Sequence, residues 1–411
     1  MKKVIVVSEH FPPLNSIAAK RYGYMGKYFE EYGYDMRVIT MRTHTGSFLG
    51  TKNEISVPIE EEKIIRIGTM GVSYPIHLLP IALIVERYRK KGRISRIING
   101  NAWGWYEKVK KEIDLDKLCD SDIVIGSFPS VGSLLVARYI SKELQIPFVA
   151  EIRDLISDFP EEGYRKNDFE IVQDIIEEKI LLRDVDLIVT VTKGFQNILK
   201  KRLKGKRLAT VYNGWEKNYE IGKEGVRGNY IYFAGTLYEH RIESLSLLID
   251  VIENVNISIH LKVRSLGPEH LTHKLRTLVC ERGATEFVEI LDAESEKVVL
   301  KEQQEALINL VPSSIHKEEK ALMTTIPGKL FELLVIDRPI LAIIPSGSEI
   351  GEILSICNKG IATTDRKRIS EFIRGSYGEY KGNPKVHDYS RKKQASKLLA
   401  ELDKTIEGKR R

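Results

Sequence analysis

The chain begins with MKKVIVVSEHFPP at residues 1–13, in which the β-branched run 4–7 is followed by polar residues and two prolines. A short apolar run of this kind is typical of a strand that is buried on both faces of a parallel sheet. Similar runs, mostly separated by stretches with helical spacing, occur at 38–40, 123–126, 147–150, 187–191 and 208–211. This alternation predicts a doubly wound α/β sheet.

A second series of apolar runs begins after the glycine-containing stretch 222–228. Its members are 230–233, 257–261, 287–290, 307–310 and 339–344. Between the first two, apolar side chains with the spacing of one helical face predict a crossover helix. These are Leu245, Leu248, Ile249 and Ile252. The sequence therefore predicts two Rossmann-like halves in succession.

The boundary between the halves is expected in the segment 212–228, which is rich in turn-forming residues and has no apolar period. We expect an N-terminal domain at 1–212 and a C-terminal domain at 213–385. The remaining residues, 386–411, carry the apolar helical stripe Ala395, Leu398, Leu399, Leu402 and Ile406. We expect them to form a helix that packs back toward the N-terminal domain and ends in a basic tail.

Length and composition indicate a globular protein, with 411 residues of which 42% are hydrophobic and 29% charged. The net charge of +7 suits an anionic partner, but acidic and basic residues are mixed and no basic-aromatic module is recognisable, which argues against nucleic acid. Three distant cysteines without metal-binding spacing predict reduced thiols in a cytoplasmic protein. The longest apolar run, 76–85, is interrupted by Pro80 and falls short of the roughly 20 residues that span a bilayer.

Ligands of open α/β sheets bind beyond the carboxyl ends of the strands, so the residues after each run are the candidates for a site. After the first run, Asn15 and Ser16 precede a helix that carries Lys20 and Arg21, and Ser16 is placed to cap it. The helix start could bind an anion, and a rigid capped connector is the structural alternative.

Arg153 and Asp154 leave the otherwise apolar run 147–150 as a pair of adjacent charges. They are candidates for ligand contacts, and a buried pair of an arginine with a carboxylate explains them equally well. After 230–233, Gly235 and Thr236 lead to Arg241 just ahead of a helix. A glycine that admits a ligand, followed by a cation, predicts a diphosphate cradle.

The most specific segment is 324–332, TTIPGKLFE, where Pro327 predicts a helix start and places Lys329 and Glu332 on one helical face. The helix start and the lysine supply positive charge where a leaving nucleoside diphosphate gains negative charge. Glu332 can accept hydrogen bonds from vicinal sugar hydroxyls. An ordinary surface pair of Lys329 and Glu332 is the structural alternative.

The chain resembles family 4 of the retaining nucleotide-sugar glycosyltransferases, and especially the bacterial branch that builds surface polysaccharides such as capsule or O-antigen. The resemblance covers nearly the whole chain. Its residues are FPPLNSIAAKR (11–21), SFPSVGSLLVARYISKELQIPFVAEIRDL (127–155), VTVT (189–192), YNG (212–214), FAGTLYEHR (233–241) and PGKLFELLVIDRPIL (327–341). It implies the GT-B fold, in which an acceptor-side N-terminal domain and a nucleotide-sugar-binding C-terminal domain face each other across a cleft.

The resemblance also implies roles for residues. Glu332 would hold the donor ribose, Arg241 the diphosphate, and Arg153-Asp154 the floor of the acceptor side. The implied donor contacts are Gly235, Thr236, Arg241, Thr324, Thr325, Ile326, Pro327, Gly328, Lys329, Leu330 and Glu332. The implied catalytic set is Arg153, Asp154, Lys329 and Arg241, and the acceptor-side set is Asn15, Ser16, Lys20 and Arg21.

The chain departs from the family pattern at two of these positions. Thr236 stands where relatives have a second cation, and Thr324 stands where they commonly have a glutamate near the donor sugar. Lys329 is expected to supply the charge that Thr236 lacks, while Thr324 leaves the donor-sugar contacts open.

The resemblance implies transfer with retained anomeric configuration, no cofactor and no metal, from a nucleotide sugar with UDP or GDP favoured, to a glycan or lipid-linked saccharide. A run of apolar residues, cations and the tryptophans Trp103 and Trp105 at 74–105 suits either a peripheral contact with the anionic inner face of the cytoplasmic membrane, or a core segment beside a solvated basic loop. The alternatives to transfer are a sugar-nucleotide epimerase and a catalytically degenerate GT-B partner subunit.

Overall fold

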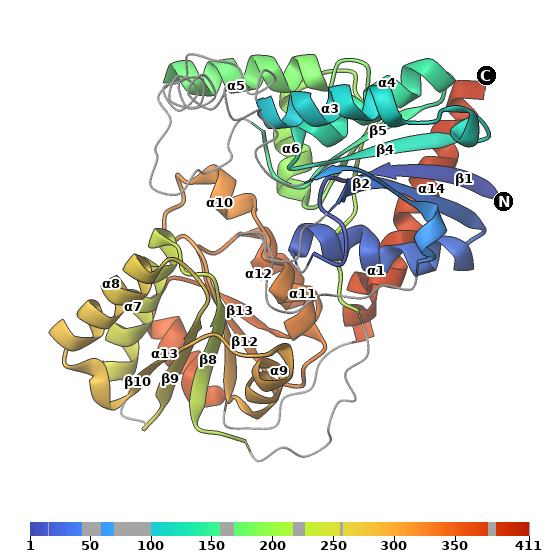
Figure 1. Cartoon of the computed structure of the whole chain (residues 1–411). Helices are drawn as coiled ribbons and strands as arrows, with labels where there is room; N and C mark the ends of the chain where they lie inside the picture. Colours follow the sequence, from blue (N-terminus) through green and yellow to red (C-terminus); the bar gives the residue numbers. More distant parts are fainter. Residues whose placement is uncertain are drawn as a thin grey trace. The chain divides into compact units, whose positions relative to one another are not determined.

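The computed structural model describes residues 1–14, 16–42, 59–69, 100–156, 168–216, 227–254, 258–376 and 384–410. The chain divides into two compact units (Figure 1). The first contains Met1–Asn213 and Arg391–Arg411, and the second contains Gly214–Ser390.

The first unit is built on a parallel sheet of seven strands in the order β3-β2-β1-β4-β5-β6-β7. The strands are β1 (Lys2–Val7), β2 (Tyr34–Arg42), β3 (Ile64–Thr69), β4 (Ile123–Phe128), β5 (Phe148–Ile152), β6 (Leu187–Thr190) and β7 (Leu208–Thr210). Apolar residues of β1 point alternately to the two faces, so Ile5 and Val7 join one core and Val4 and Val6 the other.

Helices cover both faces of this sheet (Figure 1). One face is covered by α3 (Gly100–Glu112), α4 (Val131–Leu144), α5 (Asp168–Leu181) and α6 (Lys193–Arg202), and the other by α1 (Ile17–Glu31) and α14 (Arg391–Arg410). Helix α4 packs closely on β4, because a Cβ atom added to Gly126 would lie 2.9 Å from the Ser133 carbonyl oxygen. This fixes the start of α4 beside the carboxyl end of β4.

The second unit has a parallel six-stranded sheet in the order β10-β9-β8-β11-β12-β13. The strands are β8 (Tyr230–Gly235), β9 (His260–Ser265), β10 (Val288–Leu291), β11 (Ile308–Pro312), β12 (Ile340–Ile343) and β13 (Gly360–Ala362). One face carries α7 (Glu239–Asn254), α8 (Glu269–Glu281) and α13 (Arg366–Gly375). The other carries α9 (Glu296–Glu305), α11 (Gly328–Leu334) and α12 (Glu349–Ile356), and the short α10 (Lys320–Thr324) precedes α11 (Figure 1).

Two parallel sheets with helices on both faces confirm the predicted α/β class with two Rossmann-like halves. Of the two tryptophans that the membrane interpretation of 74–105 places at the surface, the structure describes the side chain of Trp105. Its side chain is buried in the core of the first unit and donates a 2.9 Å hydrogen bond to the Ile67 carbonyl, so it is not at the surface. Residues 70–99 and the side chain of Trp103 lie outside the described residues, so the rest of that interpretation stays a prediction. In the part of the chain that the structure describes, no helix is both long and apolar enough to cross a bilayer.

Candidate functional site

Each sheet has one point where the strand order reverses, and in open α/β sheets ligands bind beside that point at the carboxyl ends of the strands. In the second unit the reversal lies between β8 and β11. In the first unit it lies between β1 and β4. A ligand is therefore expected at the carboxyl ends of β8 and β11 in the second unit and of β1 and β4 in the first.

Four of the predicted donor residues, Gly235, Thr236, Arg241 and Lys329, lie at the carboxyl end of β8, and we call them the β8 cluster. The Lys329 ammonium donates a 2.6 Å hydrogen bond to the carbonyl of Ala234. A Cβ atom added to Gly235 would lie 3.5 Å from the Lys329 Nζ and 3.2 Å from the Phe233 ring. A side chain at residue 235 would therefore be tight against the Phe233 ring, while it would make only an ordinary contact with the Lys329 ammonium.

The Arg241 guanidinium lies against the end of β8 from the first turn of α7. Its Nη1 donates a 2.6 Å hydrogen bond to the Thr236 carbonyl, and its Cζ lies 4.8 Å from the centre of the Tyr238 ring. Burial lowers the pKa of this guanidinium. Its buried Nε has no hydrogen-bond partner, and no carboxylate among the described residues forms an ion pair with Arg241. A buried cation in this state favours an anionic ligand.

His240, next to this cation, is held in its neutral form. Burial and then the charge of Arg241 lower its pKa to about 4. Its ring stacks on Tyr238 with a centroid distance of 5.5 Å and an interplanar angle of 9°. At neutral pH His240 therefore offers one donor and one acceptor nitrogen and adds no charge.

The segment 324–332 spans the end of α10 and most of α11, which begins at Gly328 directly after Pro327. The hydroxyls of Thr324 and Thr325 each donate to the Ala321 carbonyl, at 3.0 and 2.8 Å. The side chains of Ile326 and Leu330 are buried in the core. Of this segment, Lys329 and Glu332 are the residues with charged side chains, and both are partly exposed on one helix.

In the first unit, Glu9 and His10 follow β1 and lie beside the reversal point. The Glu9 main-chain N–H donates a 3.0 Å hydrogen bond to the Ser133 hydroxyl, and the Ser130 hydroxyl donates to the Glu9 carboxyl. These bonds join the loop after β1 to the first turn of α4. Burial raises the pKa of the Glu9 carboxyl to about 7. Burial and then the charge of Arg153 lower the pKa of His10 to about 4.

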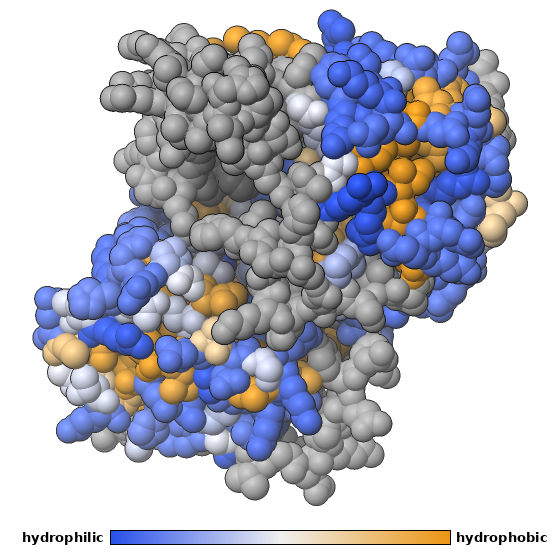
Figure 2. Space-filling view, viewed as in Figure 1, coloured by the Kyte–Doolittle hydropathy of each residue, from blue (hydrophilic) through white to orange (hydrophobic). Residues whose placement is uncertain are grey.

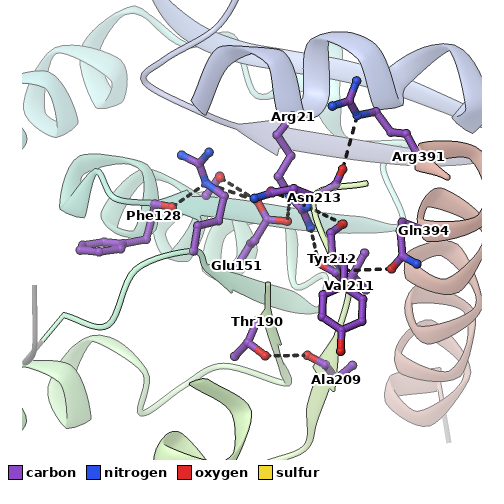
Figure 3. Close-up of polar contacts among 12 residues, drawn as sticks. Arg21, Phe128, Glu151, Thr190, Ala209, Val211, Tyr212, Asn213, Arg391 and Gln394 are labelled. Atoms are coloured by element: carbon purple, nitrogen blue, oxygen red, sulfur yellow. Dashed lines mark hydrogen bonds and ion pairs between the residues drawn. The ribbon is translucent and has the colours of Figure 1, made fainter. Parts of the chain in front are cut away.

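Arg21, Glu151 and Arg153 form a buried network between α1 and the sheet. Figure 3 shows Arg21 and Glu151 side by side, with Tyr212 and Asn213 next to Arg21. The Arg21 Nε donates to the Glu151 carboxylate at 2.7 Å, and the Arg153 Nε lies 3.9 Å from the other oxygen of that carboxylate. Arg21 also donates to the carbonyls of Val211 and Tyr212 at 3.1 and 3.0 Å. All three side chains are at most 8% exposed, so the network ties the segment 211–212, which follows β7, to α1 and β5.

The remaining predicted residues of the first unit are more dispersed. Ser16 caps α1 by accepting a 3.1 Å hydrogen bond from the Ala19 N–H, as its position suggested. Lys20 is partly exposed on the same helix, and Asn15 lies outside the described residues. Burial raises the pKa of Asp154, and the neighbouring Arg153 offsets part of that shift.

The sequence did not predict Glu9, His10 or Ser130 as site residues, although Glu9 and His10 lie in the loop that follows the run 4–7. The available signal was their position shortly after the first apolar run for Glu9 and His10, and after the run 123–126 for Ser130. Among the described residues, no group of three or more His, Cys, Asp or Glu side chains is arranged to hold a metal ion.

No protein-family model and no curated protein matches the chain. Solved structures are similar over nearly the whole length. A glycosyltransferase from Rickettsia africae has a TM-score of 0.57 at 14% identity and covers 98% of both chains. HepE from Anabaena, in complex with UDP and glucose, has a TM-score of 0.56 at 10% identity and covers 99% of this chain and 98% of its own.

A putative UDP-N-acetylglucosamine 2-epimerase from Listeria monocytogenes has a TM-score of 0.52 at 12% identity and covers 99% of this chain and 98% of its own. At identities this low the similarity concerns the fold. The chain has the GT-B fold, as the resemblance predicted.

Proposed function

We propose that this chain is a glycosyltransferase that moves a sugar from a nucleoside-diphosphate sugar to a glycan or lipid-linked saccharide in surface-polysaccharide synthesis. The observation that carries the proposal is the Arg241 guanidinium at the end of β8, buried and without a carboxylate partner among the described residues. A diphosphate is the ligand that this cation suits best.

The β8 cluster can stabilise a leaving nucleoside diphosphate without a metal. Arg241 and Lys329 are two cations at one strand end, and the neutral His240 adds a hydrogen-bonding group. Negative charge develops on the diphosphate as the glycosidic bond to the donor breaks, so preorganised cations stabilise the transition state more than the ground state. Lys329 would exchange its bond to the Ala234 carbonyl for a phosphate oxygen.

Glu332 would hold the donor ribose through its carboxylate, which accepts hydrogen bonds from vicinal hydroxyls. The first unit would bind the acceptor, with Arg153 and Asp154 at the carboxyl end of β5 and Glu9 at the end of β1. We infer retention of the anomeric configuration from the resemblance, with the donor's own phosphate taking the proton of the attacking hydroxyl.

A thermal-shift panel tests the donor proposal. The full chain is heated with UDP, GDP, ADP, CDP and sugars of each nucleotide. A ligand at about 100 times its dissociation constant adds roughly 2.7 kcal/mol of stability, so one nucleotide is expected to raise the melting temperature clearly above the others. No shift with any nucleotide would favour the catalytically degenerate subunit instead.

An epimerase is the second candidate, and two observations support it. The fold is similar to that of a putative UDP-N-acetylglucosamine 2-epimerase. Glu9, His10 and Asp154 in the first unit are also titratable groups with shifted pKa values, which acid-base chemistry on a sugar requires. An epimerase converts its nucleotide sugar without an acceptor, so product analysis of an acceptor-free reaction separates the two functions.

A further inference from the structure

Helix α11 carries Lys329 and Glu332 but is only seven residues long. Isolated helices shorter than about 12 residues are marginal in water, so packing has to hold a helix of this length in place. The buried residues of the helix are Leu330, Phe331, Leu333 and Leu334. The position of the two charged side chains therefore depends on what these apolar residues pack against.

Phe331 packs against Tyr389, which lies outside the helix and much later in the chain. The two rings are stacked, with a centroid distance of 6.0 Å and an interplanar angle of 29°. Hydrophilic residues cover most of the described surface in Figure 2, whereas Phe331 is fully buried and Tyr389 is 8% exposed. Stacked aromatic pairs stabilise a structure beyond the area that they bury, so this pair restrains the buried side of α11.

Tyr389 is itself held in place by Trp215. The Trp215 main-chain N–H donates a 3.1 Å hydrogen bond to the Tyr389 carbonyl, and the indole Nε1 donates a 3.0 Å bond to the Val386 carbonyl. The Trp215 ring also lies 5.8 Å from the His387 ring, and Trp215 is 5% exposed. The short 3₁₀ segment Pro384–Tyr389 is therefore fixed to the start of the second unit.

The two ends of α11 are restrained by lysines. Lys329 bonds to the Ala234 carbonyl in the first turn, and the Lys359 ammonium donates a 2.7 Å hydrogen bond to the Ile336 carbonyl just after the helix. Phe331 and Lys329 lie on opposite sides of the helix, because residues two positions apart are separated by about 200°. The aromatic stack therefore supports the helix from the side opposite to Lys329.

We propose that Tyr389 is a positioning residue for the donor site, whose ring sets the position of α11 and thereby of Lys329 and Glu332. This proposal rests on the proposed function, because it assumes that these two side chains bind the nucleoside diphosphate. Removal of the Tyr389 ring leaves a cavity beside Phe331, into which α11 can shift. A shift of about 1 Å in a binding group, caused by a distant substitution, can cost roughly a hundredfold in rate.

Three variants of the full chain test the proposal. Tyr389→Leu removes the ring, Tyr389→Phe keeps the ring without the hydroxyl, and Tyr230→Leu is the matched control. Tyr230 is also 8% exposed and pairs with the ring of Tyr232, but it is the first residue of β8 and lies at the end of that strand away from Gly235. Hydrogen exchange of the amides 328–336 reports how firmly α11 is held, and calorimetric titration with UDP and GDP reports donor binding.

In Tyr389→Leu the amides 328–336 are expected to exchange about tenfold faster or more, and the diphosphate that the wild type binds is expected to bind about tenfold more weakly or more. Tyr389→Phe is expected to match the wild type in both measurements. Tyr230→Leu is expected to lose stability while it keeps the wild-type affinity and the wild-type exchange of 328–336.

Wild-type exchange of 328–336 in Tyr389→Leu would overturn the proposal. Equal losses of affinity in Tyr389→Leu and Tyr230→Leu would overturn it as well, because they would assign Tyr389 a general role in stability. The absence of any diphosphate binding by the wild type would contradict the proposed function instead, and the exchange of 328–336 would still decide whether Tyr389 holds α11.

Discussion

The Lys329 ammonium donates a 2.6 Å hydrogen bond to the Ala234 carbonyl, which joins the first turn of α11 to the end of β8. These two residues are 95 positions apart in the chain. The contact brings the most specific segment of the sequence to the strand end where Arg241 lies. It makes the lysine a candidate for phosphate binding rather than for a surface pair with Glu332.

Replacement of Lys329 by alanine is predicted to lower transfer sharply and leave the fold intact. Loss of one preorganised charge at a leaving group costs roughly 10² to 10³ in rate. Steady-state kinetics and a melting curve of Lys329→Ala measure both effects. The matched control is Lys317→Ala, an exposed lysine of the same unit. Equal rates for Lys329→Ala and the control would contradict the assignment.

Glu332→Ala is predicted to weaken nucleotide binding by about tenfold or more, since the loss of hydrogen bonds that involve a charged group costs about 1.5 to 3 kcal/mol. Glu332→Gln keeps one acceptor and should lose less. Titration calorimetry with the ribonucleotide and its 2′-deoxy form gives the comparison. If Glu332 binds the ribose, the wild type prefers the ribonucleotide and the alanine variant does not. Glu371→Ala, on the exposed side of α13, serves as the control.

Arg241 is predicted to bind the diphosphate of the donor and to contribute little to the free energy of unfolding. Burial lowers the pKa of its guanidinium, so the charged form is disfavoured in the unliganded protein. Arg241→Met should lose at least tenfold in diphosphate affinity, while its free energy of unfolding falls by less than roughly 1 kcal/mol or rises. Urea unfolding and calorimetry test this pair of results. A large loss of stability with unchanged affinity would make Arg241 a structural residue.

Glu9 is predicted to make stability depend on pH. Its pKa rises from the ordinary value of 4.5 to about 7 on folding, so the folded state holds the proton more tightly than the unfolded state. Relative to Glu9→Gln, the wild type should therefore lose stability as the pH rises from 4.5 to 7 and then stay level. The full difference is roughly 2 to 4 kcal/mol, since one pKa unit is about 1.4 kcal/mol. Unfolding curves that run parallel for both proteins across this range would rule out the shift.

Arg21 is predicted to stabilise the fold of the first unit and not to bind the acceptor directly. Arg21→Met removes a cation from the fully buried Glu151 and should lower the free energy of unfolding by about 3 to 5 kcal/mol. Lys200→Met, at an exposed position of α6, should change it by less than about 0.5 kcal/mol. Wild-type stability in Arg21→Met, together with weaker acceptor binding, would instead support the acceptor role.

Much of the fold could be predicted because buried parallel strands appear as continuous apolar runs. The bounds or existence of a strand were predicted less well where the strand is not fully buried. The run at 257–261 predicted a strand that lies at His260–Ser265, because β9 alternates buried and half-exposed residues. The edge strands β3 and β13 were not predicted, since β13 has three residues and none of them is fully buried.

The sequence predicted those features of the site that depend on neighbouring residues, and it did not predict the contacts between residues that are distant in the chain. Pro327 indicates where α11 begins, but the contact of Lys329 with β8 depends on packing over 95 residues. The raised pKa of Glu9 also depends on burial by distant elements, which the sequence does not display.

Calorimetric titration of nucleoside diphosphates into the full chain tests the central claim most directly. UDP, GDP, ADP and CDP are titrated into the wild type and into the double variant Arg241→Met, Lys329→Ala. The account predicts that at least one diphosphate binds the wild type, and that the double variant binds it at least a hundredfold more weakly while it remains folded. Equal affinity in the two proteins, or no binding of any diphosphate to the wild type, would contradict it.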